Sequence, residues 1–251
     1  VLDHDAANKL AQWFKDRCGN VGASKVADII AKTKSGYSAS RANYMASLIV
    51  ERLTGGNQDS YTSPAMQWGT DTEPKAREMY QFITDNEVTL TGFVMHPSIA
   101  RSGASPDGLI GEEGSLEIKC PNTATHIETL LGSGIDGKYN TQMQWQMACT
   151  GRKWCDFVSF DPRLPVELQI KIQRVNRDDA YIAMLETEVK EFLAELDDKL
   201  KDKLRKIKAK NKSTEGFVPE DVINGAYLDS LAIFYNRAGS NLLVHSFKVE
   251  Q

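Results

Sequence analysis

The stretch that decides the fold reads Ser105-Pro106-Asp107-Gly108 and, ten residues after Asp107, Glu117-Ile118-Lys119-Cys120-Pro121. Residues 115–119 predict a strand bounded by turn-forming residues. Side chains two residues apart in a strand point to the same side, so Glu117 and Lys119 share one face and the residue between them points into the core. The glycine-rich segment Gly108–Gly114 lets the chain turn back. We therefore expect Asp107 to lie beside this pair.

Two carboxylates and one ammonium in one place indicate metal-assisted chemistry on a phosphate. Carboxylate oxygens are ligands that Mg²⁺ and Mn²⁺ prefer. A purely structural metal site has no use for an ammonium, whereas phosphodiester hydrolysis can use one to orient the attacking water and to offset charge in the transition state. Spacing alone leaves an alternative open, a Pro-Asp-Gly turn followed by an edge strand whose Glu and Lys form a surface pair.

The composition is that of a globular protein with a sizeable core, since 41% of the 251 residues are hydrophobic and 25% are charged. The formal net charge of −4 excludes a protein held to nucleic acid by bulk positive charge, but it is compatible with a local basic channel. No apolar run is long enough to span a membrane, and the first residues do not read as a secretory leader. We expect a cytoplasmic protein.

Three other kinds of site lack support in the sequence. The four cysteines show neither a CxxC pair nor zinc spacing, so we expect reduced thiols and no iron–sulfur cluster. The four histidines are scattered, and we expect them on the surface or hydrogen-bonded within the protein. The pattern G-x-x-x-x-G-K-[ST] is absent, so ATP is not expected as a cofactor.

Hydrophobic spacing predicts a helical part over residues 1–86 and a sheet core over 87–176. Helices are expected at 5–17, from Ser24, at 40–54, 64–85, 123–131 and 138–149. Strands are expected at 87–94, 100–104, 115–119, 155–160 and 166–175. A helix between strands implies a crossover connection, so we expect an α/β fold with a central mixed sheet flanked by helices. Trp68 and Trp145 are expected in the core.

One long helix is expected over 177–210, acidic in its first part and basic from Lys199 onward. The simplest interpretation is a solvated helix whose cations interact favourably with the C-terminal end of the helix dipole. The alternative is that the basic half contacts nucleic acid. The parts before residue 211 would form a single domain, 1–210. The sequence assigns no role to the tail 211–251.

The deciding stretch resembles the PD-(D/E)xK nuclease motif, and in particular its lambda-exonuclease-like (YqaJ viral recombinase) branch. Three further segments are similar to motifs of that family and stand in the same order: Trp13…Arg17…Gly22-Ala23-Ser24, Trp68-Gly69-Thr70-Asp71-Thr72-Glu73 and Tyr139-Asn140-Thr141-Gln142-Met143-Gln144. The resemblance spans roughly residues 10–200. It implies a restriction-endonuclease-like core.

The resemblance implies a metal site for Mg²⁺, or for Mn²⁺ in its place. Its ligands would be the carboxylates of Glu73, Asp107 and Glu117 and the backbone carbonyl of Ile118. For Glu73, which precedes Pro74, a second interpretation stays open, because an acid in the first turn of a helix is also favoured by the helix dipole.

The resemblance also implies roles outside the metal site. Lys119, aided by Gln142, would position the attacking water, and Arg17 and Ser24 would hold a 5′-phosphate of DNA. Met66 lies where the family places an apolar wedge that splits the duplex end. Local alternatives remain: Gln142 as an exposed helix residue, Ser24 as an N-cap, and Met66 as a buried methionine, which we favour.

As a whole, the resemblance implies a Mg²⁺-dependent 5′→3′ exonuclease that degrades one strand of linear duplex DNA to mononucleotides and leaves a 3′ single strand. It further implies a homotrimeric ring around the DNA, a single-strand annealing protein as partner, and a phage or prophage setting. Two rivals remain open. One is another nuclease of the superfamily, such as an endonuclease, and the other is a non-catalytic module that binds DNA ends.

Overall fold

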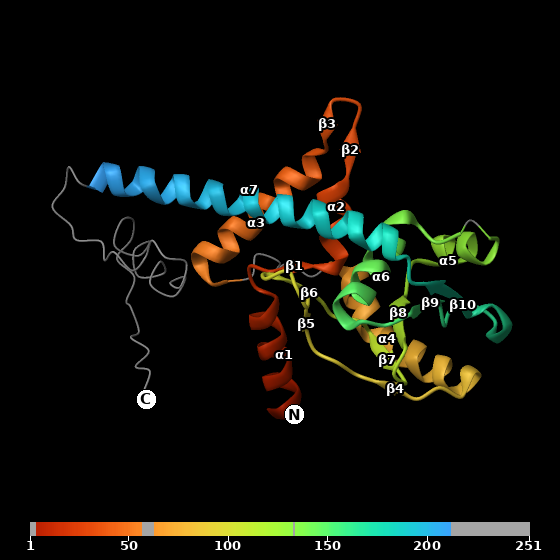
Figure 1. Ribbon diagram of the computed structural model, residues 1–251. Helices are drawn as coiled ribbons and strands as arrows, with labels where there is room; N and C mark the ends of the chain where they lie inside the picture. The colour runs from red at the N-terminus through yellow and green to blue at the C-terminus, as the bar shows by residue number, and fades with distance from the viewer. Residues whose placement is uncertain (1–3, 57–62, 133, 212–251) are drawn as a thin grey trace.

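The strand that carries Glu117 and Lys119, β8 (Gly114–Lys119), lies in the middle of a five-stranded sheet in the computed structural model (Figure 1). The structure describes residues 4–56, 63–132 and 134–211. The order of the sheet is β10 (Ile170–Asn176), β9 (Trp154–Phe160), β8, β7 (Gly108–Ile110) and β4 (Val88–Thr89). Strands β8 and β9 are parallel and the other pairs are antiparallel, which confirms the mixed sheet expected from the sequence.

Two helices form the crossover that joins β8 to β9. They are α5 (Thr123–Leu130) and α6 (Gly137–Thr150), close to the predicted ranges. Each begins at a side-chain cap, because Asn122 accepts a hydrogen bond from the Thr125 N–H and Asp136 accepts one from the Lys138 N–H. Helix α6 ends where Gly151 adopts a positive φ of 70°, a conformation that glycine adopts without strain.

The sheet lies between α4 (Pro64–Thr84) and α6. Leu116 and Ile118 point from β8 into one apolar cluster that includes Tyr80 of α4. The opposite face of the sheet packs against α6. Met143 of α6 and Phe157 of β9 belong to one apolar cluster there. Because side chains alternate along a strand, this arrangement turns Glu117 toward α6.

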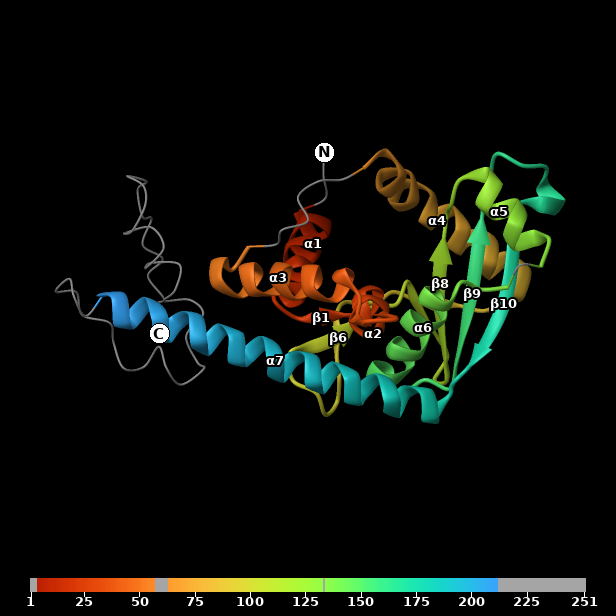
Figure 2. The same ribbon diagram turned by 90° about the horizontal axis from the view of Figure 1, so that it is seen from above.

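A second layer of helices supports α6 from the side away from the sheet. It contains α2 (Val26–Ile30), α3 (Ala39–Thr54) and the long helix α7 (Asp179–Asn211), and buried Trp145 of α6 lies in their shared core. Figure 2 shows α7 running past α3 and α2 to α6. The remaining elements are α1 (His4–Arg17), the sheet β1 (Val21–Gly22), β6 (Ser102–Ala104) and β5 (Val94–Met95), and the projecting hairpin β2 (Lys32–Thr33) and β3 (Gly36–Tyr37).

Several boundaries differ from the sequence-based prediction. The expected strand 87–94 is two strands in two sheets, since β4 pairs with β7 and β5 pairs with β6. The expected strand 166–175 begins as a 3₁₀ turn, Val166–Leu168, before β10. The segment 108–114 does turn the chain back, but its first residues form β7. The short strands β1, β2 and β3 were not predicted, because two-residue pairings leave no hydrophobic period to detect.

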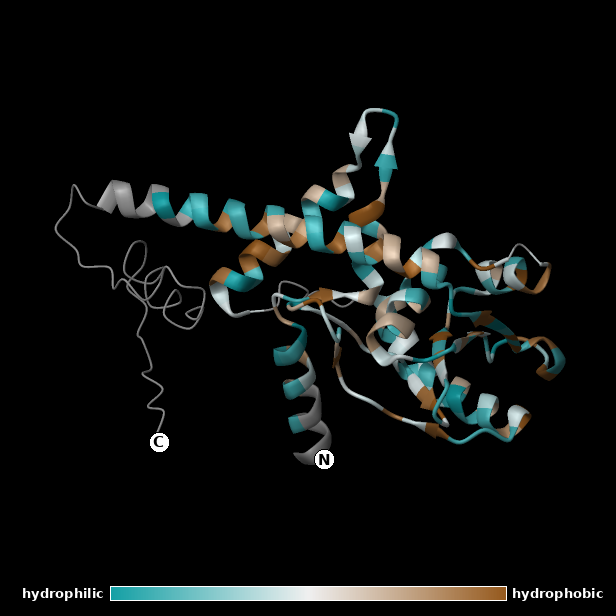
Figure 3. Cartoon of the chain, in the orientation of Figure 1, coloured by the Kyte–Doolittle hydropathy of each residue, from teal (hydrophilic) through white to brown (hydrophobic). Residues whose placement is uncertain are grey.

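The outer end of α7 carries closely spaced charges of both signs. Lys199 pairs with Glu195 one turn earlier, and Lys201 pairs with Asp198. Figure 3 shows mainly hydrophilic residues in the last coloured turns of α7, before its grey end, which fits a solvated face. The tail from residue 212 lies outside the described residues. Within the described ranges, no helix has both the length and the apolar character needed to cross a membrane.

Within the described residues the cysteines form no disulfide, and the two buried histidines accept or donate hydrogen bonds, as expected. All four cysteines are free thiols. His126 is fully buried, and its ring nitrogens lie 2.7 Å from the Ser159 hydroxyl and 2.8 Å from the Leu168 carbonyl oxygen. His96 is also buried, and its Nδ1 accepts backbone hydrogen bonds from Ser98 and Ile99. His245 lies outside the described residues.

Helix α4 is fixed to the sheet by a hydrogen bond whose loss we expect to be measurable. Tyr80 is fully buried and donates to Asp156 of β9 at 2.7 Å. Tyr80→Phe should lower the free energy of unfolding by about 1.5–3 kcal/mol, the range for a hydrogen bond to a charged group. Tyr37→Phe is the matched control, since Tyr37 donates to Glu188 at the surface. Urea unfolding that shows equal, small losses for both variants would contradict this description.

Candidate active site

The pairing of β7 with β8 places Asp107 beside Glu117. Asp107 stands immediately before β7, and its backbone N–H donates to the Leu116 carbonyl of β8 at 3.1 Å. Its side-chain Oδ2 accepts the Ile118 N–H at 2.6 Å. The two acids and Lys119 therefore meet at the C-terminal end of β8, as the sequence predicts, and the surface-pair alternative is wrong because Glu117 is fully buried.

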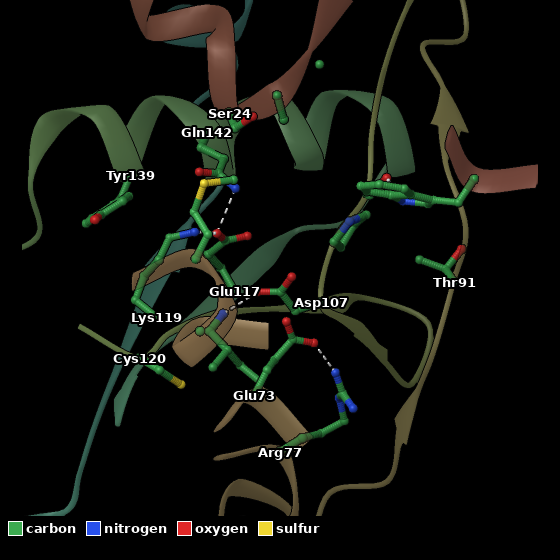
Figure 4. Close-up of a pocket in the computed structure, with 18 of the residues that line it drawn as sticks. Ser24, Glu73, Arg77, Thr91, Asp107, Glu117, Lys119, Cys120, Tyr139 and Gln142 are labelled. Carbon is green, nitrogen blue, oxygen red and sulfur yellow. Dashed lines mark hydrogen bonds and ion pairs between the residues drawn. The ribbon is translucent and has the colours of Figure 1, made fainter. Parts of the chain in front are cut away.

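The third carboxylate comes from the opposite side of the sheet. Glu73 lies in the middle of α4, where its carboxylate pairs with Arg77 one turn later. Burial raises the pKa of Glu73; Arg77 opposes this effect and Glu117 adds to it. The expectation of Glu73 in a first helical turn is wrong, because α4 begins at Pro64 with Ser63 as its N-cap and runs through Pro74. Figure 4 shows Glu73, Asp107 and Glu117 near one another in the middle of the residues that line the pocket.

Glu117 is surrounded by hydrogen-bond donors. Lys119 pairs with its Oε1, and Gln142 of α6 donates to the same oxygen at 2.7 Å. Gln146 donates to the other oxygen, Oε2, at 2.6 Å. Gln142 is half-buried and engaged, so it is not a solvated helix residue. These three donors compensate for the removal of the Glu117 carboxylate from water.

Lys119 keeps its positive charge in this environment. Burial lowers the pKa of Lys119. The carboxylates of Glu117 and Asp107 raise it by more than burial lowers it, so the pKa lies above its ordinary value. The ring of Tyr139 lies 5.1 Å from Nζ and adds a cation–π contact. Lys119 is therefore an ammonium at neutral pH, suited to orienting a water or opposing negative charge rather than to taking up a proton.

The acidic residues fit a divalent cation by their chemistry. Burial raises the pKa of Asp107 well above its ordinary value, and Glu117 and Glu73 raise it further, while Lys119 opposes them. A bound divalent ion would offset this repulsion, and oxygen donors are those that Mg²⁺ and Mn²⁺ prefer. Across the described ranges, no three His, Cys, Asp or Glu side chains are already spaced as ligands of one ion, in keeping with the pairing of Glu73 to Arg77 and of Glu117 to Lys119.

One pocket of about 750 Å³ joins the carboxylates to the N-terminal segment. Arg17 and Ser24 line it together with Asp107, Glu117 and Lys119. The Arg17 guanidinium lies 4.2 Å from the centre of the Trp13 ring, and Trp13 Nε1 donates to the Ser105 hydroxyl at 2.9 Å. The pocket thus holds a guanidinium and a hydroxyl, groups that can hydrogen-bond a phosphate, together with three acids.

Ser24 is not the N-cap that the sequence suggested. It lies within a 3₁₀ turn, Ala23–Lys25, and the N-cap of α2 is Lys25 without a side-chain hydrogen bond. The 3₁₀ turn follows directly on β1, which ends at Gly22, and α2 begins only at Val26. The hydroxyl of Ser24 faces the pocket region beside Gln142 (Figure 4).

Met66 and Trp68 occupy positions that the sequence did not predict correctly. Met66 is 54% exposed and lines the pocket, so the expectation of a buried methionine is wrong. It lies in the first turn of α4. Trp68 is half-buried, with the Arg163 guanidinium 4.4 Å from its ring centre, whereas Trp145 is fully buried as expected.

The prediction missed three residues that contact the site. Gln146 and Arg77 each lie one turn after a predicted residue, Gln142 and Glu73, and helical spacing alone could have placed them on the same faces. Tyr139 was part of a quoted motif, but its contact with Lys119 depends on how α6 packs on the sheet.

The mixed sheet with Asp107, Glu117 and Lys119 at the end of β8 defines the PD-(D/E)xK nuclease fold. A family model described as the YqaJ-like viral recombinase domain matches residues 12–153, more than half of the chain. The chain belongs to this family, the lambda-exonuclease-like branch of the superfamily.

Solved structures agree with this assignment. The chain is 52% identical to LHK-Exo, an alkaline exonuclease from Laribacter hongkongensis, over 80% of this chain and 98% of that one, with a TM-score of 0.74. A second structure of LHK-Exo, in complex with dAMP, matches equally well. A phage-related exonuclease from Haemophilus somnus 129PT shares the fold at 15% identity, with a TM-score of 0.55 over 75% of this chain and 96% of that one. No curated protein sequence matches the chain.

The crowded carboxylates should make the metal-free protein sensitive to pH. A carboxyl whose pKa is raised on folding stabilises the folded state at low pH, and that stabilisation is lost as pH rises through the raised value. Asp107→Asn removes the group, so the variant should be more stable than wild type at pH 7, by on the order of 1 kcal/mol.

Urea unfolding in EDTA between pH 5 and 8 measures this effect. Wild type should lose stability with rising pH more steeply than Asp107→Asn. The control is Asp136→Asn at the exposed cap of α6, where a backbone hydrogen bond lowers the pKa of the acid below this range. Parallel pH profiles for wild type and Asp107→Asn would contradict the electrostatic description of the site.

Proposed function

We propose that this protein is a Mg²⁺-dependent 5′→3′ exonuclease that degrades one strand of linear duplex DNA to mononucleotides and leaves a 3′ single strand. Its family and its 52% identity to an alkaline exonuclease support the broader statement, a nuclease that acts on DNA. One observation carries the proposal: three acids and Lys119 share a pocket with Arg17 and Ser24.

The cation would be held by carboxylates from three segments of the chain. Glu73 of α4, Asp107 before β7 and Glu117 of β8 would supply side-chain oxygens, and Ile118 would supply its carbonyl oxygen. Mg²⁺ suits this set, and Mn²⁺ can replace it. When bound, such an ion supplies Lewis acidity to the phosphodiester and to the attacking water.

Residues of β8 and α6 would prepare the water for in-line attack. The Lys119 ammonium and the Gln142 amide lie on the same side of Glu117, and each can hold a water oxygen by donating a hydrogen bond. As the water oxygen loses a proton and bonds to phosphorus, the bond from phosphorus to the 3′ oxygen breaks and that oxygen takes up a proton, so that one water is consumed and the proton count is unchanged. The terminal nucleotide leaves with its 5′-phosphate, and Lys119 opposes the negative charge that develops.

Two other residues that line the pocket would select the strand end. Arg17 and Ser24 can hold the terminal 5′-phosphate, the guanidinium by charge-assisted hydrogen bonds and the hydroxyl by donation. A phosphate fixed there places the next phosphodiester toward the carboxylates. Met66, exposed at the rim, suits the apolar wedge against the first base pair.

We further propose a homotrimeric ring and a single-strand annealing partner in the cytoplasm of a bacterium or a phage-infected cell. Support for these assignments comes from the family. A ring that encloses DNA would make degradation processive without ATP. The product strand would then pass directly to a protein that anneals it.

Linear duplex DNA labelled at one 5′ end tests the proposed activity. With Mg²⁺, the label should appear first as an acid-soluble mononucleotide, and covalently closed circular DNA should stay intact. Cutting of the closed circle would instead indicate an endonuclease. Binding of ends without acid-soluble product would indicate the non-catalytic module.

Lys119→Ala should slow this degradation by roughly 100-fold or more, because the charge that positions water and opposes the transition state is removed. Lys153→Ala is the matched control, since Lys153 pairs with Glu113 at the surface in the same way as Lys119 pairs with Glu117. Circular dichroism checks the fold of both variants. Undiminished degradation by folded Lys119→Ala would remove the assignment.

Recognition of the strand end can be tested separately at Arg17. Arg17→Ala should slow digestion of 5′-phosphorylated ends by roughly tenfold or more, the effect of one lost charge-assisted hydrogen bond. Digestion of 5′-hydroxyl ends should change much less. Lys15→Ala, which removes an exposed cation from the same turn of α1, controls for general attraction of DNA. Equal slowing on both substrates would reject the assignment of Arg17 to the phosphate.

A further inference from the structure

Helix α6 supplies a hydrogen-bond donor to each of the two carboxylate oxygens of Glu117. Gln142 and Gln146 are four residues apart on α6, so they project from the same face toward β8. The Gln142 amide donates to Oε1 of Glu117 at 2.7 Å, and the Gln146 amide donates to Oε2 at 2.6 Å. The two glutamines therefore grip the two oxygens of one carboxylate.

The two residues differ in what else they can reach. Gln142 is half-buried and lines the pocket, where substrate and water can contact it. Gln146 is 0% exposed and lies behind Glu117, so it cannot touch DNA. Any effect of Gln146 on the reaction must pass through the carboxylate that it holds.

The hydrogen bonding of Gln146 is one-sided. Its Oε1 is buried without a hydrogen-bond partner, although its Nε2 is bonded to Glu117. Gln144, two residues earlier and also buried, uses both ends: its Oε1 accepts the Asp178 N–H and its Nε2 donates to the Asn176 carbonyl. An unpaired buried oxygen costs stability, so Gln144 has the pattern of a structural glutamine and Gln146 does not.

We propose that Gln146 is a positioning residue that holds Glu117 in the orientation in which it binds a divalent cation. The inference rests on the proposed function, because it takes Glu117 as a metal ligand. Without Gln146, the hydrogen bond to Oε2 of Glu117 is lost, and the remaining donors, Lys119 and Gln142, both bind Oε1. The carboxylate is then free to turn about its terminal bond, and metal ligands that lose such a partner bind the ion more weakly.

Isothermal titration of the full chain with MgCl₂ and MnCl₂, without DNA, tests this role. Gln146→Met keeps the length of the side chain and removes both the donor and the unpaired oxygen. Its affinity for the cation should fall by roughly 10- to 100-fold, and its urea midpoint in EDTA should fall as well, because Oε2 of buried Glu117 loses the Gln146 donor. Gln144→Met is the matched control, and it should lose stability but keep the wild-type affinity.

A second variant keeps the test decisive if the first does not fold. Gln146→Asn retains the amide on a side chain one methylene shorter, which cannot span the distance to Oε2, so the same loss of affinity is expected. Wild-type affinity in either folded variant would overturn the role of Gln146, and the proposed nuclease would stand. A wild-type chain that binds neither ion would overturn the proposed function and this inference together.

Discussion

The register of the β7–β8 hairpin is the constraint on which the rest of the site depends. Gly108 is paired with Leu116, and this pairing sets Asp107 against the backbone of Ile118. A shift of one residue would turn Glu117 to the side of α4 and Ile118 toward α6, because side chains alternate along a strand. The core enforces the correct register, since Leu116 and Ile118 belong to the apolar cluster that α4 covers. Packing of two apolar residues thus places the two acids.

The acids that this register brings together repel one another, and the neighbouring residues compensate for this repulsion. Arg77 pairs with Glu73, and Lys119 pairs with Glu117, whose second oxygen is held by Gln146. The arrangement costs stability, as sites that bind ions or stabilise charged transition states commonly do.

The sequence was sufficient to predict the elements with strong local signals. Helix α4 begins where Ser63 caps it and Pro64 fills its first turn, and β8 stands between turn-forming residues. Elements whose bounds depend on pairing with distant segments were harder to predict from local sequence. The split of residues 87–94 into β4 and β5 is decided by pairing with β7 and β6, which leaves no trace in local composition.

The same distinction applies to the site. Asp107, Glu117 and Lys119 could be placed together because strand geometry and a glycine-rich turn determine their relation. The exposure of Met66 and the burial of Gln146 depend on how helices pack, and spacing along a helix does not reveal which face is covered. Ser24 lines the pocket, but it lies in a 3₁₀ turn and is not the N-cap of α2 that local sequence suggested.

Anomalous diffraction from crystals soaked in MnCl₂ tests the central claim most directly, because it locates the ion without relying on activity. The account predicts a manganese peak within coordination distance of carboxylate oxygens of Asp107 and Glu117, with Glu73 turned toward it. Manganese peaks found only elsewhere on the protein, with none at these carboxylates, would contradict it.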